Sequence, residues 1–116
     1  MAAKYDFTIE QGANHSFQVQ YKNADGSVFD FTGYSAKLQA RKTVSATDVL
    51  IELVSTTDIT FDLPLGKMTI NFLPAKTIPL ANTKQTLVYD LEVTNGLTNV
   101  LRIIDGTITI NPEVTR

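Results

Sequence analysis

Apolar and polar residues alternate with a period of two along most of the chain. In the stretch HSFQVQY, Phe17, Val19 and Tyr21 alternate with polar residues, the pattern of a strand with one buried and one solvent-exposed face. Four further stretches alternate in the same way, with apolar positions at Ala36, Leu38 and Ala40; Met68, Ile70 and Phe72; Leu87, Tyr89, Leu91 and Val93; and Ile108 and Ile110. The many threonines beside valine and isoleucine also favour strands over helices.

Turn-forming sequences separate these stretches at short intervals. Residues 23–26 (NADG), Thr32-Gly33 and Asn95-Gly96 supply residues that tolerate positive φ where the chain reverses. Asp105-Gly106 is the sharpest signal, because it is flanked by LRII and TITI and matches a two-residue hairpin loop. We therefore expect a terminal hairpin there. The last strand, which Pro112 prevents from pairing further, is expected at or near a sheet edge.

Helical segments are few. Pro74 can open a single turn within residues 74–81, and Pro79 would interrupt anything longer. Residues 43–54 (TVSATDVLIELV) start like a helix, but their β-branched residues favour a strand after a loop.

About eight or nine short strands without a long helix predict an all-β fold, an immunoglobulin-like or fibronectin-like antiparallel β-sandwich. A small closed barrel is the alternative architecture. The length of 116 residues suits a single domain spanning residues 1–116. Tyr89 lies where a tyrosine corner would be placed, although an ordinary core tyrosine fits the position equally well.

Composition and charge exclude several classes of protein. Hydrophobic residues make up 43% of the chain and charged residues 19%, enough apolar surface for a folded core. The formal charge of −2 lacks the basic surface that nucleic-acid binding requires, so we expect no nucleic-acid partner. Cysteine is absent, which excludes disulfides and thiolate metal sites. No apolar run has the length of a signal peptide or a membrane span, so we expect neither classical export nor membrane insertion.

The candidate metal sites have simpler interpretations. His15 is the only histidine and has no evident metal or catalytic partner, so we interpret it as a surface residue. Four aspartates invite comparison with calcium loops, which place oxygen ligands at alternate positions within about a dozen residues. That pattern is missing here, and turn formation is the better interpretation of Asp25, Asp30, Asp58 and Asp62.

The remaining candidates also favour structural roles. The glycines form no GxGxxG or GxxxxGK motif and are interpreted as turn glycines. Phe29 and Phe31 suit the core better than an exposed docking patch. Asp90 and Glu92 share one face of a strand about 6.5–7 Å apart, within the range of acid–base carboxylate pairs, but a solvated sheet face explains them. We therefore predict no catalytic, cofactor-binding or metal-binding residues.

Five short motifs follow one another in a fixed order along the chain: Gln11-Gly12, Asp30-Phe31-Thr32-Gly33-Tyr34, Tyr89-Asp90-Leu91, Asp105-Gly106 and Val114-Thr115-Arg116. Together, in this order, they resemble a group of small bacteriophage virion proteins, and the resemblance covers nearly the whole chain. The same layout is similar to the N-terminal domain of phage upper baseplate proteins. Baseplate proteins of that type continue into a coiled-coil or receptor-binding part. This chain ends at Arg116, so we expect that it is not itself the fibre.

The resemblance implies a non-enzymatic virion structural protein of a tailed phage. We expect it in the tail or baseplate, assembled in the host cytoplasm and joined to tail, baseplate or fibre proteins as many copies in a symmetric assembly. The alternatives are a capsid decoration or neck protein with the same sandwich, and a host-glycan-binding module, which the absence of tryptophan disfavours. In each case the outer surface and the strand edges would make the contacts.

Overall fold

The computed structural model describes residues 3–96 and 99–114 and is built almost entirely from β-strands. Two single 3₁₀ turns interrupt the strands: η1 lies between β6 and β7, and η2 lies between β7 and β8. In chain order the elements are β1 (Ala3–Lys4), β2 (Phe7–Glu10), β3 (His15–Gln20), β4 (Ser35–Arg41), β5 (Ile51–Val54), β6 (Ile59–Asp62), η1 (Leu63–Leu65), β7 (Lys67–Phe72), η2 (Pro74–Lys76), β8 (Gln85–Thr94) and β9 (Val100–Asn111).

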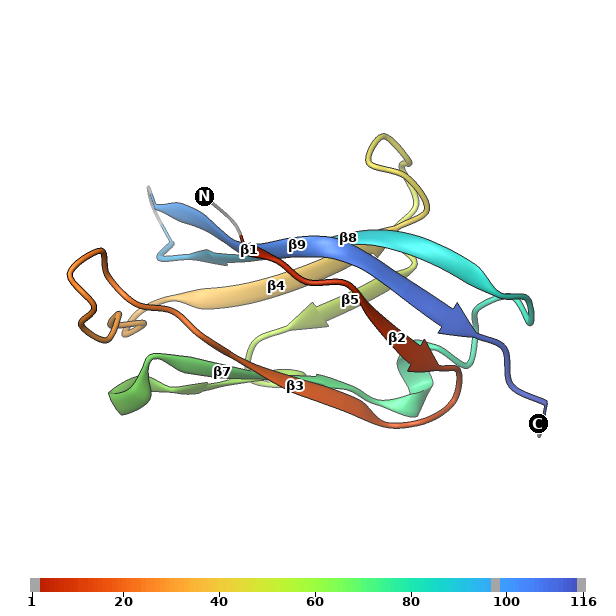
Figure 1. The fold of residues 1–116 in the computed structure, drawn as a ribbon, viewed down its shortest axis with the longest axis horizontal. Coiled ribbons are helices and arrows are strands. Elements are labelled where there is room, and N and C mark those ends of the chain that lie inside the picture. The colour runs from red at the N-terminus through yellow and green to blue at the C-terminus, as the bar shows by residue number, and fades with distance from the viewer. Residues whose placement is uncertain (1–2, 97–98, 115–116) are drawn as a thin grey trace.

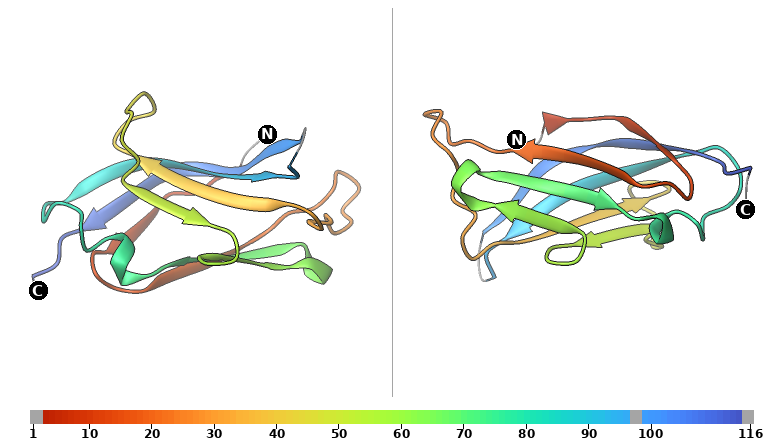
Figure 2. Two further views of the ribbon diagram at one scale, coloured as in Figure 1. Left: turned by 180° about the vertical axis from the view of Figure 1, so that it is seen from behind. Right: turned by 90° about the horizontal axis from the view of Figure 1, so that it is seen from below.

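The strands form two sheets stacked face to face (Figure 1). Sheet A has the order β1-β9-β8-β4-β5, and β2 also pairs with β9; sheet B has the order β3-β7-β6. Two separate sheets make a sandwich, as predicted, and not the alternative closed barrel. Seen from below, β3 forms one flank of sheet B, and β1 and β2 run along the same side of the molecule (Figure 2).

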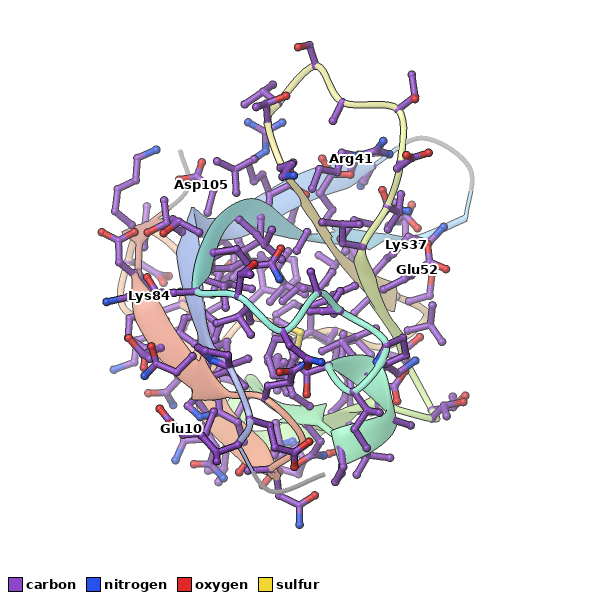
Figure 3. All side chains as sticks on the ribbon, turned by 90° about the vertical axis from the view of Figure 1, so that its right-hand side faces the viewer. Glu10, Lys37, Arg41, Glu52, Lys84 and Asp105 are labelled. Atoms are coloured by element: carbon purple, nitrogen blue, oxygen red, sulfur yellow. The ribbon has the colours of Figure 1, made fainter. Side chains whose placement is uncertain are left out.

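The two-residue alternation places the core as predicted. Alternate side chains of β4, β7 and β8 are fully or almost fully buried, and they belong to one cluster with Ile108 and Ile110 of β9. The intervening residues are half-buried or exposed on the outer faces. Viewed along the long axis, the labelled charged side chains, among them Glu10, Lys37 and Glu52, lie at the periphery around this apolar interior (Figure 3). Burial of these apolar side chains, at about 25 cal/mol per Å², is the main stabilising contribution.

One edge of sheet A is parallel, whereas we expected antiparallel pairing throughout. β1 and β2 both run parallel to β9, with Ala3 opposite Ile104 and Phe7 opposite Ile108. The last strand was expected at or near a sheet edge; it lies next to the edge, between β8 and the N-terminal strands β1 and β2, and does not form the edge itself. Pro112 follows the end of β9 and interrupts no ladder bond.

The hairpin predicted at Asp105-Gly106 is wrong. β9 continues through both residues, and Gly106 pairs with Tyr89 in the middle of the β8–β9 ladder. The chain reverses instead after β8, at Asn95-Gly96, where Gly96 has φ 87°. Glycine is required at 106 for a different reason, since a Cβ there would lie 2.3 Å from the carbonyl oxygen of Tyr5.

The two ambiguous segments agree with their predictions. Pro74 opens the single 3₁₀ turn η2, and residues 43–50 form a loop that leads into the short strand β5. Within the described residues, no helix is long and apolar enough to span a bilayer.

Candidate functional site

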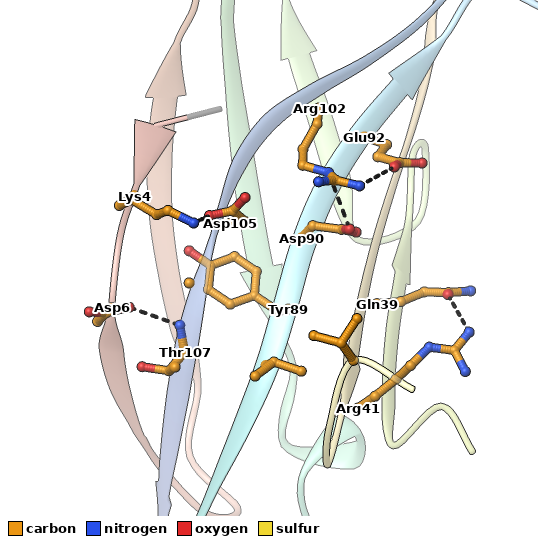
Figure 4. A pocket seen from close by; sticks show the side chains of 13 residues that line it. Lys4, Asp6, Gln39, Arg41, Tyr89, Asp90, Glu92, Arg102, Asp105 and Thr107 are labelled. Carbon is orange, nitrogen blue, oxygen red and sulfur yellow. Dashed lines mark hydrogen bonds and ion pairs between the residues drawn. The ribbon is translucent and has the colours of Figure 1, made fainter. Parts of the chain in front are cut away.

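A hollow on the outer face of sheet A has a volume of about 640 Å³ (Figure 4). Strands β4, β8 and β9 form its floor, and the segment from β1 to β2 forms one wall. Its lining is mostly charged and polar, because outward positions of these strands alternate with the core positions. The side chains that matter for its chemistry are those of Lys4, Asp6, Arg41, Tyr89, Asp90, Glu92, Arg102 and Asp105.

At the wall of this hollow, side-chain contacts attach the N-terminal segment to β8 and β9. The strand is interrupted between β1 and β2, and there the carboxylate of Asp6 accepts a hydrogen bond from Thr107 N–H at 2.9 Å. The hydroxyl of Tyr89 donates to the Tyr5 carbonyl at 2.6 Å. Lys4 forms an ion pair with Asp105. The parallel edge is therefore held by side chains as well as by ladder bonds.

Tyr89 is a buried anchor and not a tyrosine corner. A tyrosine corner bonds to backbone a few residues upstream, whereas Tyr89 bonds to Tyr5, 84 positions away. Burial, followed by the negative charges of Asp6 and Asp105, raises the pKa of the Tyr89 hydroxyl well above its ordinary value. The hydroxyl is thus kept protonated as a donor.

The two carboxylates of β8 lie on one sheet face, as predicted, and share a cation. Arg102 Nε lies 3.5 Å from Asp90 Oδ2, and Arg102 Nη2 lies 3.7 Å from Glu92 Oε2. All three side chains are substantially exposed, so each pair contributes at most about 1 kcal/mol. These three residues therefore form a solvent-exposed ion-pair network on the outer face of the sheet, as the interpretation of a solvated face predicts. Sequence analysis did not single out Arg102, because the segment that contains it was expected to pair with residues 107–110 in a terminal hairpin.

The other arginine of the hollow, Arg41, holds the loop after β4. Its Nη1 donates to the carbonyls of Ala46 and Thr47 at 2.8 and 2.9 Å, and its Nη2 donates to Gln39 Oε1 at 3.1 Å. Both arginines of the hollow therefore have partners within the chain. The hollow therefore presents charged and polar groups that are largely paired with one another.

His15 lies in an aromatic cluster between the sheets, contrary to the predicted surface position. Its ring stacks on Phe7 with centroids 5.2 Å apart and an interplanar angle of 4°, and it meets Phe72 edge-on. The ring is half-buried, and its Nε2 has no hydrogen-bond partner among the described residues. Burial lowers the pKa of His15. Partial removal of the ring from water therefore favours the neutral imidazole.

Asp25 and Asp30 make exposed turns, as we predicted. Asp25 Oδ1 accepts hydrogen bonds from the backbone N–H and hydroxyl of Ser27, and Asp30 Oδ1 does the same with Thr32. These bonds stabilise the ionised carboxylates and lower both pKa values.

The other two aspartates differ in their surroundings. Asp58 lies in the turn between β5 and β6, as predicted, but its side chain is buried. Its carboxylate accepts from Val54 N–H at 3.2 Å and faces Lys76 at 3.4 Å. Asp62 precedes η1, and its side chain makes no capping bond to that turn. Within the described residues, no group of three or more histidine, aspartate and glutamate side chains could hold a metal ion.

Phe29 and Phe31 belong to the apolar interior, as predicted. Phe31 is 1% exposed and Phe29 is half-buried against it, with ring centroids 4.8 Å apart. Tyr34 packs edge-on against both rings.

Gln11 forms a structural junction that residue patterns alone did not reveal. Its buried Nε2 donates to the carbonyls of Thr77 and Leu80 at 3.2 and 2.9 Å, and its Oε1 accepts from Glu113 N–H at 2.9 Å. Next to it, Gly12 N–H donates to Thr77 Oγ1 at 2.8 Å. One glutamine thus joins the β2–β3 turn, the loop after η2 and the segment after β9. The only signal in the sequence was the Gln11-Gly12 pair itself.

Comparison with known proteins adds no further assignment. No protein-family model matches the sequence, and no curated protein matches it either.

Proposed function

We propose that the chain is a non-enzymatic structural protein of a tailed-bacteriophage virion, located in the tail or baseplate. There it would connect or anchor larger tail or fibre proteins, as many copies in a symmetric assembly. The single observation that carries this proposal is the resemblance of nearly the whole sequence to small phage virion proteins. Assembly would take place in the host cytoplasm.

The positions of the motif residues support a similarity in overall fold between this chain and the phage proteins that it resembles. Gln11 joins three segments, Asp30 and Thr32 shape the turn before β4, and Gly106 permits the close approach of Tyr5. Residues of this kind are needed wherever the same backbone is built. They carry no chemistry that would point to a substrate.

The strand order supports an immunoglobulin-like assignment within this proposal. Sheet A places β9, β8 and β4 side by side with β5 beyond them, and sheet B places β3 beside β7 and β6. In immunoglobulin terms these are a GFC sheet extended by C′, and a BED sheet. Strands β1 and β2 then take the place of a first strand that pairs with the last one.

Quantitative mass spectrometry of purified particles tests the placement. We expect the chain in particles of the phage that carries its gene. Its number of copies per particle, calibrated against the major capsid protein, should be a small multiple of three or six. Hundreds of copies would favour the decoration protein, and absence from particles would refute a virion role.

Electron microscopy of particles labelled with antibody to the chain provides the second measurement. Label at the tail tip is the expected result, and label on capsid faces alone would contradict it. Micromolar binding on a glycan array would favour the adhesion module instead.

A further inference from the structure

Strand β3 is an exposed edge that lacks the usual protection against pairing. Natural edge strands are kept from pairing by charged residues, proline, bulges or short length. β3 has six residues, the sequence HSFQVQ, an unbroken register with β7, and neither proline nor a lysine or carboxylate side chain. No other strand of the described residues pairs with its outer side.

The hydrogen-bonding groups on this edge follow from the ladder. Tyr21 N–H, just after β3, donates to the carbonyl oxygen of Gly66, the residue immediately before β7. Hydrogen-bonded residues alternate along an antiparallel pair. The odd-numbered residues of β3 therefore bond to β7. The backbone N–H and C=O groups of Ser16, Gln18 and Gln20 point away from the sheet, and all three residues are exposed.

The other sheet edges differ from β3 in length and charge. β1 has two residues and includes Lys4, whereas β2, β5 and β6 have four residues each and include Glu10, Glu52 and Asp62. Charged residues and short length are among the usual protections of an edge strand against pairing with another strand. Among the edges in the described chain, β3 is the one that has neither protection.

We infer that β3 is a self-association surface, and that its partner is β3 of a second copy, antiparallel across a two-fold axis. The register that uses every free group places Gln18 opposite Gln18 and Ser16 opposite Gln20. Three residues on each strand, each with one donor and one acceptor, then form six hydrogen bonds. An isologous contact of this kind closes on itself as a dimer.

The side chains beside the edge also favour a covering partner. Phe17 of β3 is half-buried, and Tyr5, with its ring centroid 5.2 Å from that of Phe17, is 41% exposed. Phe17 belongs to β3 and Tyr5 lies between β1 and β2, and these three strands run along the same side of the molecule (Figure 1). A second β3 would extend sheet B and remove part of this aromatic surface from water, which adds a hydrophobic contribution.

Cysteine crosslinking tests this register directly, because the chain has no cysteine of its own. Paired hydrogen-bonded residues have Cα atoms about 5.5 Å apart, within the roughly 4.4–6.8 Å that a disulfide spans. We expect Gln18→Cys to form disulfide dimers several-fold faster than Thr60→Cys, an exposed position on the other edge strand of sheet B. Equal rates would overturn the proposal.

Sedimentation equilibrium of the intact chain gives an independent test. Interfaces smaller than about 1,200 Å² are characteristic of weak association, and a single strand pair belongs to that class, so a wide range of protein concentrations is needed. We expect a monomer–dimer equilibrium that Gln18→Lys weakens at least about ten-fold, equivalent to about 1.4 kcal/mol, while Thr60→Lys leaves it unchanged. A monomer at every concentration, or a dimer insensitive to Gln18→Lys, would refute the pairing. The measurement uses the isolated chain and is therefore independent of the proposed virion role.

Discussion

Replacing Gly106 by alanine is expected to detach the N-terminal strand from β9 next to Tyr5. A Cβ at this position would lie 2.3 Å from the Tyr5 carbonyl oxygen and 2.7 Å from Asp6 Oδ1. Contacts this short require one of the two segments to move, and the Tyr5 atom belongs to the backbone. Because β9 is held on its other side by β8, the edge segment is the part that yields.

The loss can be worked out from two hydrogen bonds that depend on this segment. Tyr89 donates to Tyr5 O, and Thr107 N–H donates to the Asp6 carboxylate. A neutral hydrogen bond contributes about 1 kcal/mol and one to a charged group about 1.5–3 kcal/mol. Gly106→Ala should therefore lower the free energy of unfolding by about 2.5–4 kcal/mol, and the melting temperature by roughly 10 °C or more.

Urea unfolding and amide hydrogen exchange check this expectation together. We expect a lower midpoint with an unchanged m-value, and faster exchange of the Thr107 amide. Gly33→Ala is the matched control, since Gly33 has φ 82° but open space around the added Cβ. It measures the backbone strain alone.

A double-mutant cycle with Tyr89→Phe separates the mechanism from general destabilisation. If alanine at position 106 already breaks the Tyr89–Tyr5 bond, the double variant should be more stable than the sum of the single effects predicts, by about 1 kcal/mol. Additive effects, combined with unchanged exchange at Thr107, would show that the reasoning from the Tyr5 approach is wrong.

Three further predictions concern the interior polar groups. Gln11→Leu should cost about 2–4 kcal/mol in urea unfolding, because buried carbonyls lose their donor, whereas Gln18→Leu on the surface should be nearly neutral. Because the pKa of His15 is lowered in the folded chain, the unfolded chain binds the proton at a higher pH than the folded chain does. Wild-type stability should therefore fall as the pH drops below the ordinary histidine pKa of 6.5. In thermal melts from pH 8 to pH 5, His15→Gln should show a smaller fall in melting temperature. Lys76→Met should destabilise the fold by about 1–3 kcal/mol, because Asp58 stays buried without its cation; adding Asp58→Asn should recover part of that loss in thermal melts.

The strands and the core could be predicted from the sequence because both depend on local periodicity. Alternation along β8 alone fixes which side chains of Leu87, Leu91 and Val93 face the core, and the structure buries all three. The same holds for the loop and strand after residue 43. Sequence reasoning is reliable where neighbours along the chain decide the outcome.

Asp105-Gly106 shows where such reasoning fails. Asn95-Gly96 and Asp105-Gly106 are both strong local turn signals, yet the chain reverses at the first and runs straight through the second. The deciding contact is the approach of Tyr5, about a hundred residues away, which leaves no room for a side chain. Local sequence patterns do not indicate contacts with distant segments. A glycine that permits such a close contact cannot be distinguished from a turn glycine by the residues around it.

The phage-like motifs support a similarity of backbone architecture, but they do not identify the surfaces that bind partners. Gln11, Gly106 and the Asp30 turn all occur where one backbone segment meets another, so a likeness in these residues is a likeness of architecture. Partner surfaces need no such residues. On a sandwich, contacts between copies depend on free N–H and C=O groups and on the absence of charge, and the uncharged edge of β3 meets both conditions without any motif. Oligomeric state measured on Gln18 variants is therefore more informative about assembly than any further comparison of motifs.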